Sequence, residues 1–132
     1  MTDRELVELA FTMLERAYVP YSHFPVGAAL ECADGTVFTG CNVENAAYGS
    51  CICAERTALV KAVSEGHRDF RRIAIVGTGA DYCWPCGACR QMLYEFAPGM
   101  TVLVSRADHS ITSTTLDALM PHGFGPKSLE KD

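Results

Sequence analysis

The residues of this chain best suited to chemistry lie in two short cysteine motifs. Cys53–Glu55 reads CAE and Pro85–Cys89 reads PCGAC, so together they offer three thiols and one carboxyl group. Zinc held by three protein ligands keeps a fourth position open for water, and a nearby carboxylate can move the protons of that water. The motifs therefore predict a hydrolytic zinc site in which Glu55 carries protons rather than binding the metal.

The spacing of these motifs also predicts where two helices begin. Cys86 and Cys89 lie on one face of a helix, which Pro85 is suited to start. Cys53 should open a second helix, because Glu55 would otherwise point about 200° away around the helix axis. The thiolates would then lie at helix N-termini, where dipoles and free N–H groups favour negative charge. We therefore expect two helix starts to meet at one zinc ion.

The charge of such a site requires an explanation. Three thiolates outweigh the positive charge of one zinc ion, so the site would be a poor Lewis acid unless something offset the excess. The helix N-termini would help, and Arg56, next to Glu55, is a candidate for thiolate charge neutralisation. An ordinary solvated helix position for Arg56 is an equally open interpretation.

Two further cysteines leave a different kind of zinc site open. Cys83 and Cys86 form a second C-x-x-C pair, and Cys51 stands close before Cys53. A closed four-cysteine site would be structural, with no position for water. Pro85 places Cys83 in the loop before the helix, which favours the open three-cysteine site. The other cysteines are expected to be buried or loop thiols, and the histidines show no ligand spacing.

Composition places the chain among ordinary globular proteins. It has 132 residues, of which 48% are hydrophobic and 20% charged, with a formal net charge of −5. We expect residues 1–132 to form a single domain, because this length suffices for one core. The acidic balance disfavours nucleic acid as a partner, and short apolar runs disfavour a membrane. Seven cysteines without a signal-peptide pattern favour metal ligation or free thiols, and hence a cytoplasmic location.

Hydrophobic periodicity predicts an α/β fold in which helices and strands alternate. A capping-box pattern at Thr2 and Glu5 begins the first helix, Asp34-Gly35 is a hairpin signal, and Gly66 is a helix stop. We expect helices at 3–18, 53–65 and 86–96, with a short helical turn at 116–120. We expect strands at 26–32, 37–41, 72–77, 101–105 and 111–115, a loop at 42–51 and a loosely held tail at 125–132.

Four motifs, in order along the chain, resemble those of the small cytidine deaminases. They are Pro20–Ala29 (PYSHFPVGAA), Asn42–Tyr48 (NVENAAY), Cys53–Ala58 (CAERTA) and Pro85–Gln91 (PCGACRQ). The last two match the deaminase signature H-x-E followed by P-C-x-x-C, with cysteine in place of the histidine. The resemblance implies a three-layer α/β/α fold with a five-stranded mixed sheet. It also implies hydrolytic deamination of cytidine and deoxycytidine to uridine and deoxyuridine, with release of ammonia.

The resemblance implies roles for individual residues as well. Cys53, Cys86 and Cys89 would bind one Zn²⁺ per subunit, and Glu55 would be the catalytic proton shuttle. Because enzymes of this class are typically homotetramers, sites completed by neighbouring subunits are expected. The substrate-binding residues would be Phe24 at the pyrimidine, Asn42 and Glu44 at the ribose hydroxyls, the loop residues Asn45, Ala46 and Tyr48, and also Ala54 and Phe124.

Several alternatives remain open at this point. A related enzyme could deaminate an aminonucleoside antibiotic such as blasticidin, or a free base, although the run Asn42–Asn45 favours a substrate with ribose. A nucleic-acid editing deaminase is disfavoured by the acidic balance, and a non-catalytic protein with a structural four-cysteine zinc stays possible. Without the resemblance, Asn42 and Glu44 would be interpreted as turn residues and Phe24 as core. Trp84 departs from the small residues usual in that motif, and we expect it either at the pocket rim or at a subunit contact.

Overall fold

Three α-helices and five strands make up the fold in a computed structural model, which describes residues 1–130. The helices are α1 (Asp3–Thr12), α2 (Ala54–Ser64) and α3 (Gly87–Phe96). The strands are β1 (Val26–Cys32), β2 (Val37–Cys41), β3 (Phe70–Gly77), β4 (Thr101–Ser105) and β5 (Ile111–Thr115). Within residues 1–130, no helix combines the length and the apolar character needed to cross a bilayer.

The strands form one mixed sheet in the order β2-β1-β3-β4-β5. β3 and β4 pair in parallel, and the other neighbouring strands pair antiparallel. A parallel pair requires a crossover connection, and α3 supplies it between β3 and β4. The start of α3 therefore comes from the loop that follows the carboxyl end of β3.

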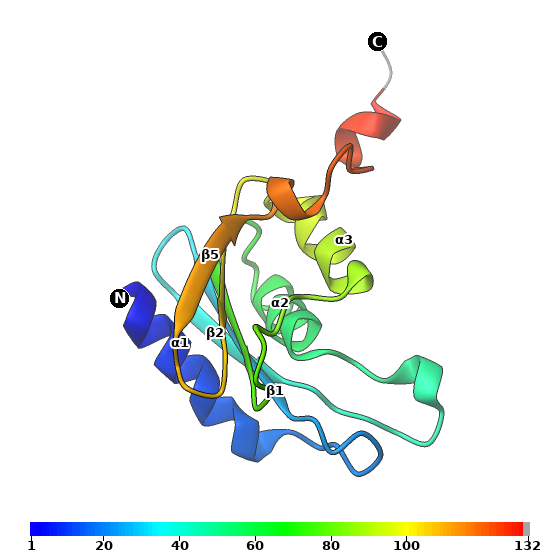
Figure 1. The fold of residues 1–132 in the computed structure, drawn as a ribbon. Helices are drawn as coiled ribbons and strands as arrows, with labels where there is room; N and C mark the ends of the chain where they lie inside the picture. The colour runs from blue at the N-terminus through cyan, green and yellow to red at the C-terminus, as the bar shows by residue number, and fades with distance from the viewer. Residues whose placement is uncertain (131–132) are drawn as a thin grey trace.

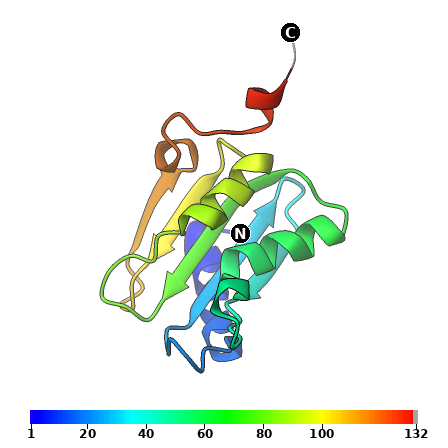
Figure 2. The ribbon, with the colours of Figure 1, turned by 90° about the vertical axis from the view of Figure 1, so that its right-hand side faces the viewer.

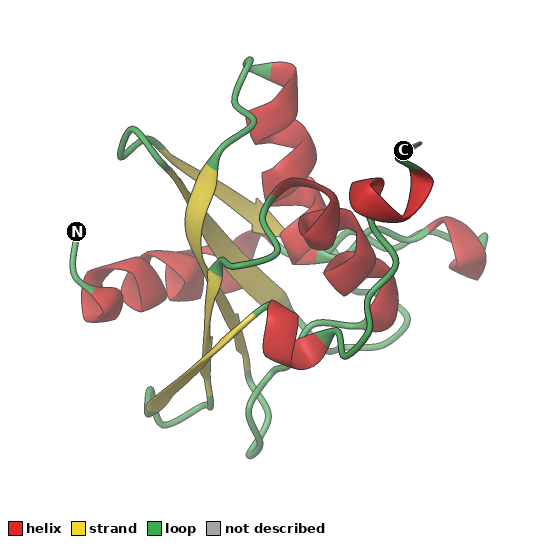
Figure 3. Cartoon of the chain, turned by 90° about the horizontal axis from the view of Figure 1, so that it is seen from above, coloured by secondary structure: helices red, strands yellow, loops and turns green. Residues whose placement is uncertain are grey.

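Helices cover both faces of the sheet (Figures 1 and 2), with α1 on one face and α2 and α3 on the other. Side chains alternate along each strand, so Leu30 packs in the core cluster under α2 and α3, whereas Ala29 packs under α1. In β3, Ile75 and Val76 divide between the two clusters in the same way. Figure 3 shows the same layers from above. The three-layer α/β/α fold with a five-stranded mixed sheet is confirmed.

Most predicted elements agree with the structure. β1, β2, β4 and β5 have the expected bounds, and β3 begins two residues early, at Phe70. The capping box at the start of α1 is present, because Glu5 N–H donates to Thr2 Oγ1 and Thr2 N–H donates to Glu5 Oε1. Gly66, the expected helix stop, has a φ of 95° beyond the end of α2. Asp117–Leu119 forms the expected helical turn as a 3-10 turn.

The prediction for the first helix was too long. α1 ends at Thr12, a 3-10 turn spans Met13–Arg16, and the chain is no longer helical at Tyr18. The reason is a pairing distant in sequence: Tyr18 N–H donates to Asn42 O at 3.0 Å, and Glu44 N–H donates to Tyr18 O at 2.9 Å. These bonds draw the end of the segment away from helical geometry.

Two segments expected to be irregular carry more structure than the sequence predicted. Val43 forms isolated bridges with Tyr18 and Ile52, and a 3-10 turn spans Tyr48–Ser50. The tail contains a 3-10 turn at Pro126–Leu129, and the remainder of the predicted tail at 131–132 lies outside the described residues. Backbone pairing therefore closes the 42–51 loop just before α2 and joins its start to Tyr18.

A buried ion pair joins the N-terminal segment to the sheet. Arg72 makes two hydrogen bonds to the Glu31 carboxylate, Nε to Oε1 at 2.8 Å and Nη2 to Oε2 at 2.6 Å. The Glu31 side chain is 3% exposed, and the hydrogen bonds from Arg72 lower the pKa of this carboxyl. Arg72 also donates to Asp3 Oδ1 and to Met1 O, so one guanidinium links β3 to β1 and to the start of α1.

Candidate active site

Three thiols converge where α2 and α3 begin. Cys53 is the N-cap residue of α2, Cys86 is the N-cap residue of α3, and Cys89 lies in the first turn of α3. Cys53 Sγ lies 3.8 Å from Cys86 Sγ, and Cys86 Sγ lies 3.4 Å from Cys89 Sγ. All three sulfur atoms lie within 4.8 Å of one another. The two helix starts predicted from the motif spacing are thus confirmed, and they do meet at one point.

The spacing of the sulfur atoms fits a zinc ion. A tetrahedral site with Zn–S bonds of about 2.3 Å separates its sulfur atoms by about 3.8 Å. Across residues 1–130, the cluster able to hold a metal at this place contains three thiols, and neither Cys51 nor Cys83 joins it. Three sulfur ligands leave one tetrahedral position free, which is the arrangement of a catalytic zinc site rather than a structural one.

Arg56 lies against this cluster. Its Nη2 is 3.6 Å from Cys53 Sγ and 3.4 Å from Cys51 O. A hydrogen bond with Cys89 and the contact with Arg56 lower the pKa of Cys53 to about 5, and the same contact raises the pKa of Arg56. The hydrogen bond with Cys53 and burial raise the pKa of Cys89, because two neighbouring thiols resist a second negative charge. The structure thus places a fixed positive charge beside the thiolates.

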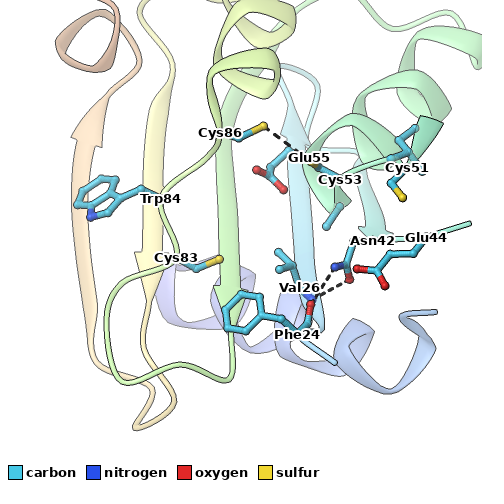
Figure 4. A pocket seen from close by; sticks show the side chains of 12 residues that line it. Phe24, Val26, Asn42, Glu44, Cys51, Cys53, Glu55, Cys83, Trp84 and Cys86 are labelled. Carbon is cyan, nitrogen blue, oxygen red and sulfur yellow. Dashed lines mark hydrogen bonds between the residues drawn. The ribbon is translucent and has the colours of Figure 1, made fainter. Parts of the chain in front are cut away.

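Glu55 is a buried carboxyl group beside the thiols. Its exposed fraction is 4%, and burial raises its pKa to about 7, with the negative charge of Cys53 acting in the same direction. Figure 4 shows its carboxyl group pointing into the space between Cys86 and Phe24. A carboxyl group with a pKa near neutrality can both accept and donate a proton there.

A cavity of about 260 Å³ opens in front of Glu55 and the thiols. Its wall is largely apolar, with the Phe24 ring on the side opposite Cys86 (Figure 4). Its two carboxyl groups belong to Glu44 and Glu55, and its lining within the described residues includes no Lys or Arg. The full lining consists of Phe24, Val26, Asn42, Glu44, Cys51, Ile52, Cys53, Ala54, Glu55, Cys83, Trp84 and Cys86.

Two polar residues expected at the substrate organise the wall of the cavity. Asn42 Oδ1 accepts from Val26 N–H at 2.8 Å, and Asn42 Nδ2 donates to Phe24 O at 2.9 Å. Glu44 Oε1 accepts from the backbone N–H groups of Tyr21 and Ser22 at 3.1 Å each, and these bonds lower the pKa of Glu44. Each side chain keeps hydrogen-bonding capacity beyond these contacts.

Four residues expected at the substrate lie outside the lining of this cavity. Tyr48 lines an adjoining depression with Tyr21, Ser22 and Glu44, and its side chain is 70% exposed. Asn45 Oδ1 accepts from Ala47 N–H, and Ala46 is exposed in the same loop. Phe124 is 57% exposed in the C-terminal segment, where its carbonyl accepts from Gln91 Nε2. Within one chain these four residues do not line the cavity beside the predicted zinc ligands.

The cavity is also lined by Cys83, which the sequence did not place there, and by Trp84, for which the pocket rim was one of two expected places. Cys83 lies beside Phe24 over β3: a Cβ at Gly77 would lie 3.3 Å from Cys83 Sγ and 3.1 Å from Phe24 Cζ. Burial raises the pKa of Cys83 to about 12, so it stays a neutral thiol. Trp84 lies at the rim, packed at a tilt on Tyr82. The sequence signal for Cys83 and Trp84 was their position directly before the Pro85–Cys89 motif.

Comparisons with known proteins agree with this fold and site. The family model described as "Cytidine and deoxycytidylate deaminase zinc-binding region" matches residues 1–105. A cytidine deaminase of Sporosarcina psychrophila is 50% identical over 116 residues, which cover 87% of this chain and 85% of that protein. A crystal structure of cytidine deaminase from Burkholderia pseudomallei superposes with a TM-score of 0.91 at 47% identity, covering 94% of this chain and 100% of that one.

The fold, the three-thiol cluster and the buried glutamate define a zinc-dependent hydrolase. The chain belongs to the cytidine and deoxycytidylate deaminase family. One further relative bears on the choice of substrate: a Blasticidin-S deaminase of Bacillus cereus is 31% identical over 127 residues, covering 90% of this chain and 89% of that protein.

Proposed function

We propose that this chain deaminates cytidine and deoxycytidine to uridine and deoxyuridine. The observation that carries the proposal is the buried Glu55 carboxyl group beside three convergent thiols, at the base of a cavity with an aromatic wall. Relatives named cytidine deaminase at up to 50% identity support the same reaction. Water and the substrate enter, and ammonia and the uracil nucleoside leave.

In this proposal Cys53, Cys86 and Cys89 hold one zinc ion. A zinc ion there supplies a water molecule that is acidic enough to act as a nucleophile near neutral pH. Arg56 offsets part of the thiolate charge through its contact with Cys53 Sγ. Without that offset, three thiolates would weaken the electrophilic character of the site.

Glu55 moves the protons of the reaction. It takes a proton from the attacking water and delivers it to N3 of the cytosine ring while the water oxygen bonds to C4. It then transfers the second water proton to the 4-amino group, and the C4–N bond breaks to release ammonia. Its burial suits this role, because a carboxyl group with a pKa near 7 is available as both base and acid.

The other lining residues suit a nucleoside. Phe24 offers an apolar face to the pyrimidine, Ala54 leaves room beside the thiols, and Asn42 and Glu44 offer a donor and an acceptor to the ribose hydroxyls. The two charged side chains in the lining are both acidic, so a 5′-phosphate would meet repulsion and no cation. This charge pattern favours a nucleoside over a nucleotide or a nucleic acid.

We also propose a homotetramer in which neighbouring subunits complete each site. Large apolar side chains are exposed near the cavity and in the C-terminal segment, including Tyr18, Tyr48 and Phe124. A partner subunit would bring Asn45, Ala46, Tyr48 and Phe124 toward the substrate, because within one chain they lie outside the cavity lining. Light scattering after size-exclusion chromatography tests this assembly, and an active monomer would refute it. The seven free cysteines suit a reducing compartment, so a cytoplasmic location is part of the proposal.

One substrate panel tests the proposed activity. The zinc-loaded protein is incubated separately with cytidine, deoxycytidine, cytidine 5′-monophosphate, cytosine and blasticidin S, and ammonia release is measured. We expect turnover of the two nucleosides and at least about a hundredfold lower kcat/KM for the phosphate ester and the free base. Chelator-treated protein is the control, and activity should return with zinc. Faster turnover of blasticidin S than of cytidine would favour the second candidate, which the Bacillus cereus relative supports.

A further inference from the structure

We propose a second zinc site, formed by Cys32, Asp34 and His67, at the end of α2 remote from the first cluster. The three residues come from the end of β1, the turn between β1 and β2, and the segment after α2. Their donor atoms, one sulfur, one carboxylate oxygen and one imidazole nitrogen, lie within 4.8 Å of one another. No ligand spacing around His67 is visible in the sequence, because its partners lie far from it along the chain.

The distances suit a shared cation better than a direct bond between the side chains. His67 Nδ1 lies 3.8 Å from Asp34 Oδ2, which is beyond the length of an N–H···O hydrogen bond. Nitrogen and oxygen ligands of a tetrahedral zinc ion are separated by about 3.4 Å. A shift of a few tenths of an ångström in exposed side-chain atoms would therefore bring these two donors to ligand positions.

The backbone holds each of the three residues in place. Cys32 N–H donates to Thr36 O at 2.8 Å, and Thr36 N–H donates to Asp34 Oδ1 at 2.9 Å, which leaves Oδ2 toward His67. His67 N–H donates to Ala62 O at 3.0 Å. Carboxylates that bind metals are commonly held by hydrogen bonds from groups outside the ligand set. Here one oxygen of Asp34 is held in this way, and the other is directed at His67.

Packing between the two segments supplies the rest of the positioning. Ala33 N–H donates to Asp69 O at 2.9 Å, so the turn and the segment after α2 are joined by a backbone bond. The His67 ring packs edge-on against Phe38, with 5.2 Å between ring centroids. Figure 2 shows the turn between β1 and β2 beside the chain that leaves α2.

The type and charge of the three donors match a zinc ion. One thiolate and one carboxylate balance the charge of Zn²⁺, and imidazole, thiolate and carboxylate are all zinc ligands. The donors lie just beyond the C-terminus of α2, where Arg68 Nη1 already donates to Val63 O at 2.9 Å. α2 has 11 residues and is therefore about 16 Å long, so the proposed site is separate from the thiols at its N-terminus.

A metal at this site would join the β1–β2 turn to the end of α2. Cobalt(II) is a suitable probe, because a thiolate ligand gives it a charge-transfer absorption in the near ultraviolet. It is added to full-length protein whose first site is already loaded with zinc. We expect a second bound equivalent with the thiolate absorption, and a rise in the melting temperature with excess zinc.

Two variants test the assignment without disturbing the core. Asp34→Asn and His67→Gln change an exposed and a half-buried side chain, and each should weaken binding of the second cobalt ion at least about tenfold. His122→Gln, at an exposed histidine elsewhere, is the matched control and should bind like the parent. Cys32→Ser should abolish the thiolate absorption, but Cys32 is buried, so Asp34→Asn and His67→Gln decide the outcome.

The proposal is overturned by either of two results. Equal cobalt binding by the parent, Asp34→Asn and His67→Gln would identify an adventitious ion only. A second equivalent without thiolate absorption in the parent protein would exclude Cys32 as a ligand. Activity on nucleosides is not a readout here, so failure of this proposal and failure of the proposed function are distinguishable.

Discussion

Replacing Glu55 by glutamine tests the proposed chemistry with the smallest change in shape. The side chain is 4% exposed and adjoins the thiols without being part of their cluster. Glutamine keeps the size of the side chain and can still donate a hydrogen bond to the ring. It cannot take a proton from water. The zinc content should therefore stay at one ion in the first site, whereas turnover should nearly disappear.

The expected loss can be worked out from the lining of the cavity. General acid–base catalysis by a positioned side chain contributes about 10²–10⁴-fold, and Glu55 is proposed to carry two protons in each turnover. The other carboxyl group, Glu44, cannot replace it readily, because Oε1 already accepts two backbone N–H bonds. We therefore expect kcat to fall about 10⁴-fold, which corresponds to about 5.4 kcal/mol in the activation barrier. KM should change by less than about threefold, because the contacts with the nucleoside remain.

Steady-state deamination of cytidine, followed by ultraviolet absorbance, measures this loss alongside zinc content and thermal unfolding. Glu65→Gln, the same chemical change beyond the other end of α2, is the matched control and should leave kcat unchanged. Glu55→Gln should be at least as stable as the parent protein, because burial opposes the charged form of Glu55. A variant that keeps more than about a tenth of the parent kcat with full zinc would refute the proton-shuttle role.

Three further changes address charge, folding and ligand number. Arg56→Ala should weaken zinc retention against a chelator about 10–100-fold and should lower kcat. If both values were unchanged, Arg56 would be an ordinary solvated helix residue with no role in neutralising the thiolates. Glu31→Gln should lower the free energy of unfolding by about 2 kcal/mol near neutral pH, measured with urea, because half-buried Arg72 loses its charge-assisted bonds to Glu31 and keeps only those to Asp3 and Met1 O. The pKa of Glu31 is held below its ordinary value of 4.5, so this stabilisation is complete above that pH. It is lost as the pH falls through the lowered pKa, so a difference from the parent that persisted in acid would contradict the assignment. Cys83→Ser should leave three sulfur ligands by X-ray absorption, and a loss of one sulfur would support the closed site.

Local signals explain why much of the fold could be predicted from the sequence. Alternating apolar residues and the Asp34-Gly35 turn define the β1–β2 hairpin, and the Thr2–Glu5 capping box fixes the start of α1. The two cysteine motifs fixed the starts of α2 and α3, because their chemistry is consistent only with N-cap positions. In each case the determining contacts lie within a few residues of one another.

Features that depend on distant contacts were not predictable. The extended backbone at Tyr18, beyond the 3-10 turn that follows α1, pairs with the segment around Val43, and no local pattern specifies this pairing. Asn42 holds the backbone at Phe24 and Val26, and this role follows from the packing of β1 beside the 42–51 loop. The grouping of Cys32 with His67 likewise exists only because a turn packs against the end of α2.

The starts of the helices show how function has modified local stability in this chain. α1 begins with a capping box, but Cys53 and Cys86 occupy the N-cap positions of α2 and α3 without any side-chain capping bond. A conventional Ser, Thr or Asp cap would stabilise each helix by about 0.5–2 kcal/mol. The fold lacks this stabilisation at both positions, where two helix N-termini attract thiolate charge. Because metal binding adds its free energy to folding, a bound zinc ion would more than offset the missing caps. Helix ends that break the capping preference are therefore best understood here as ligand positions.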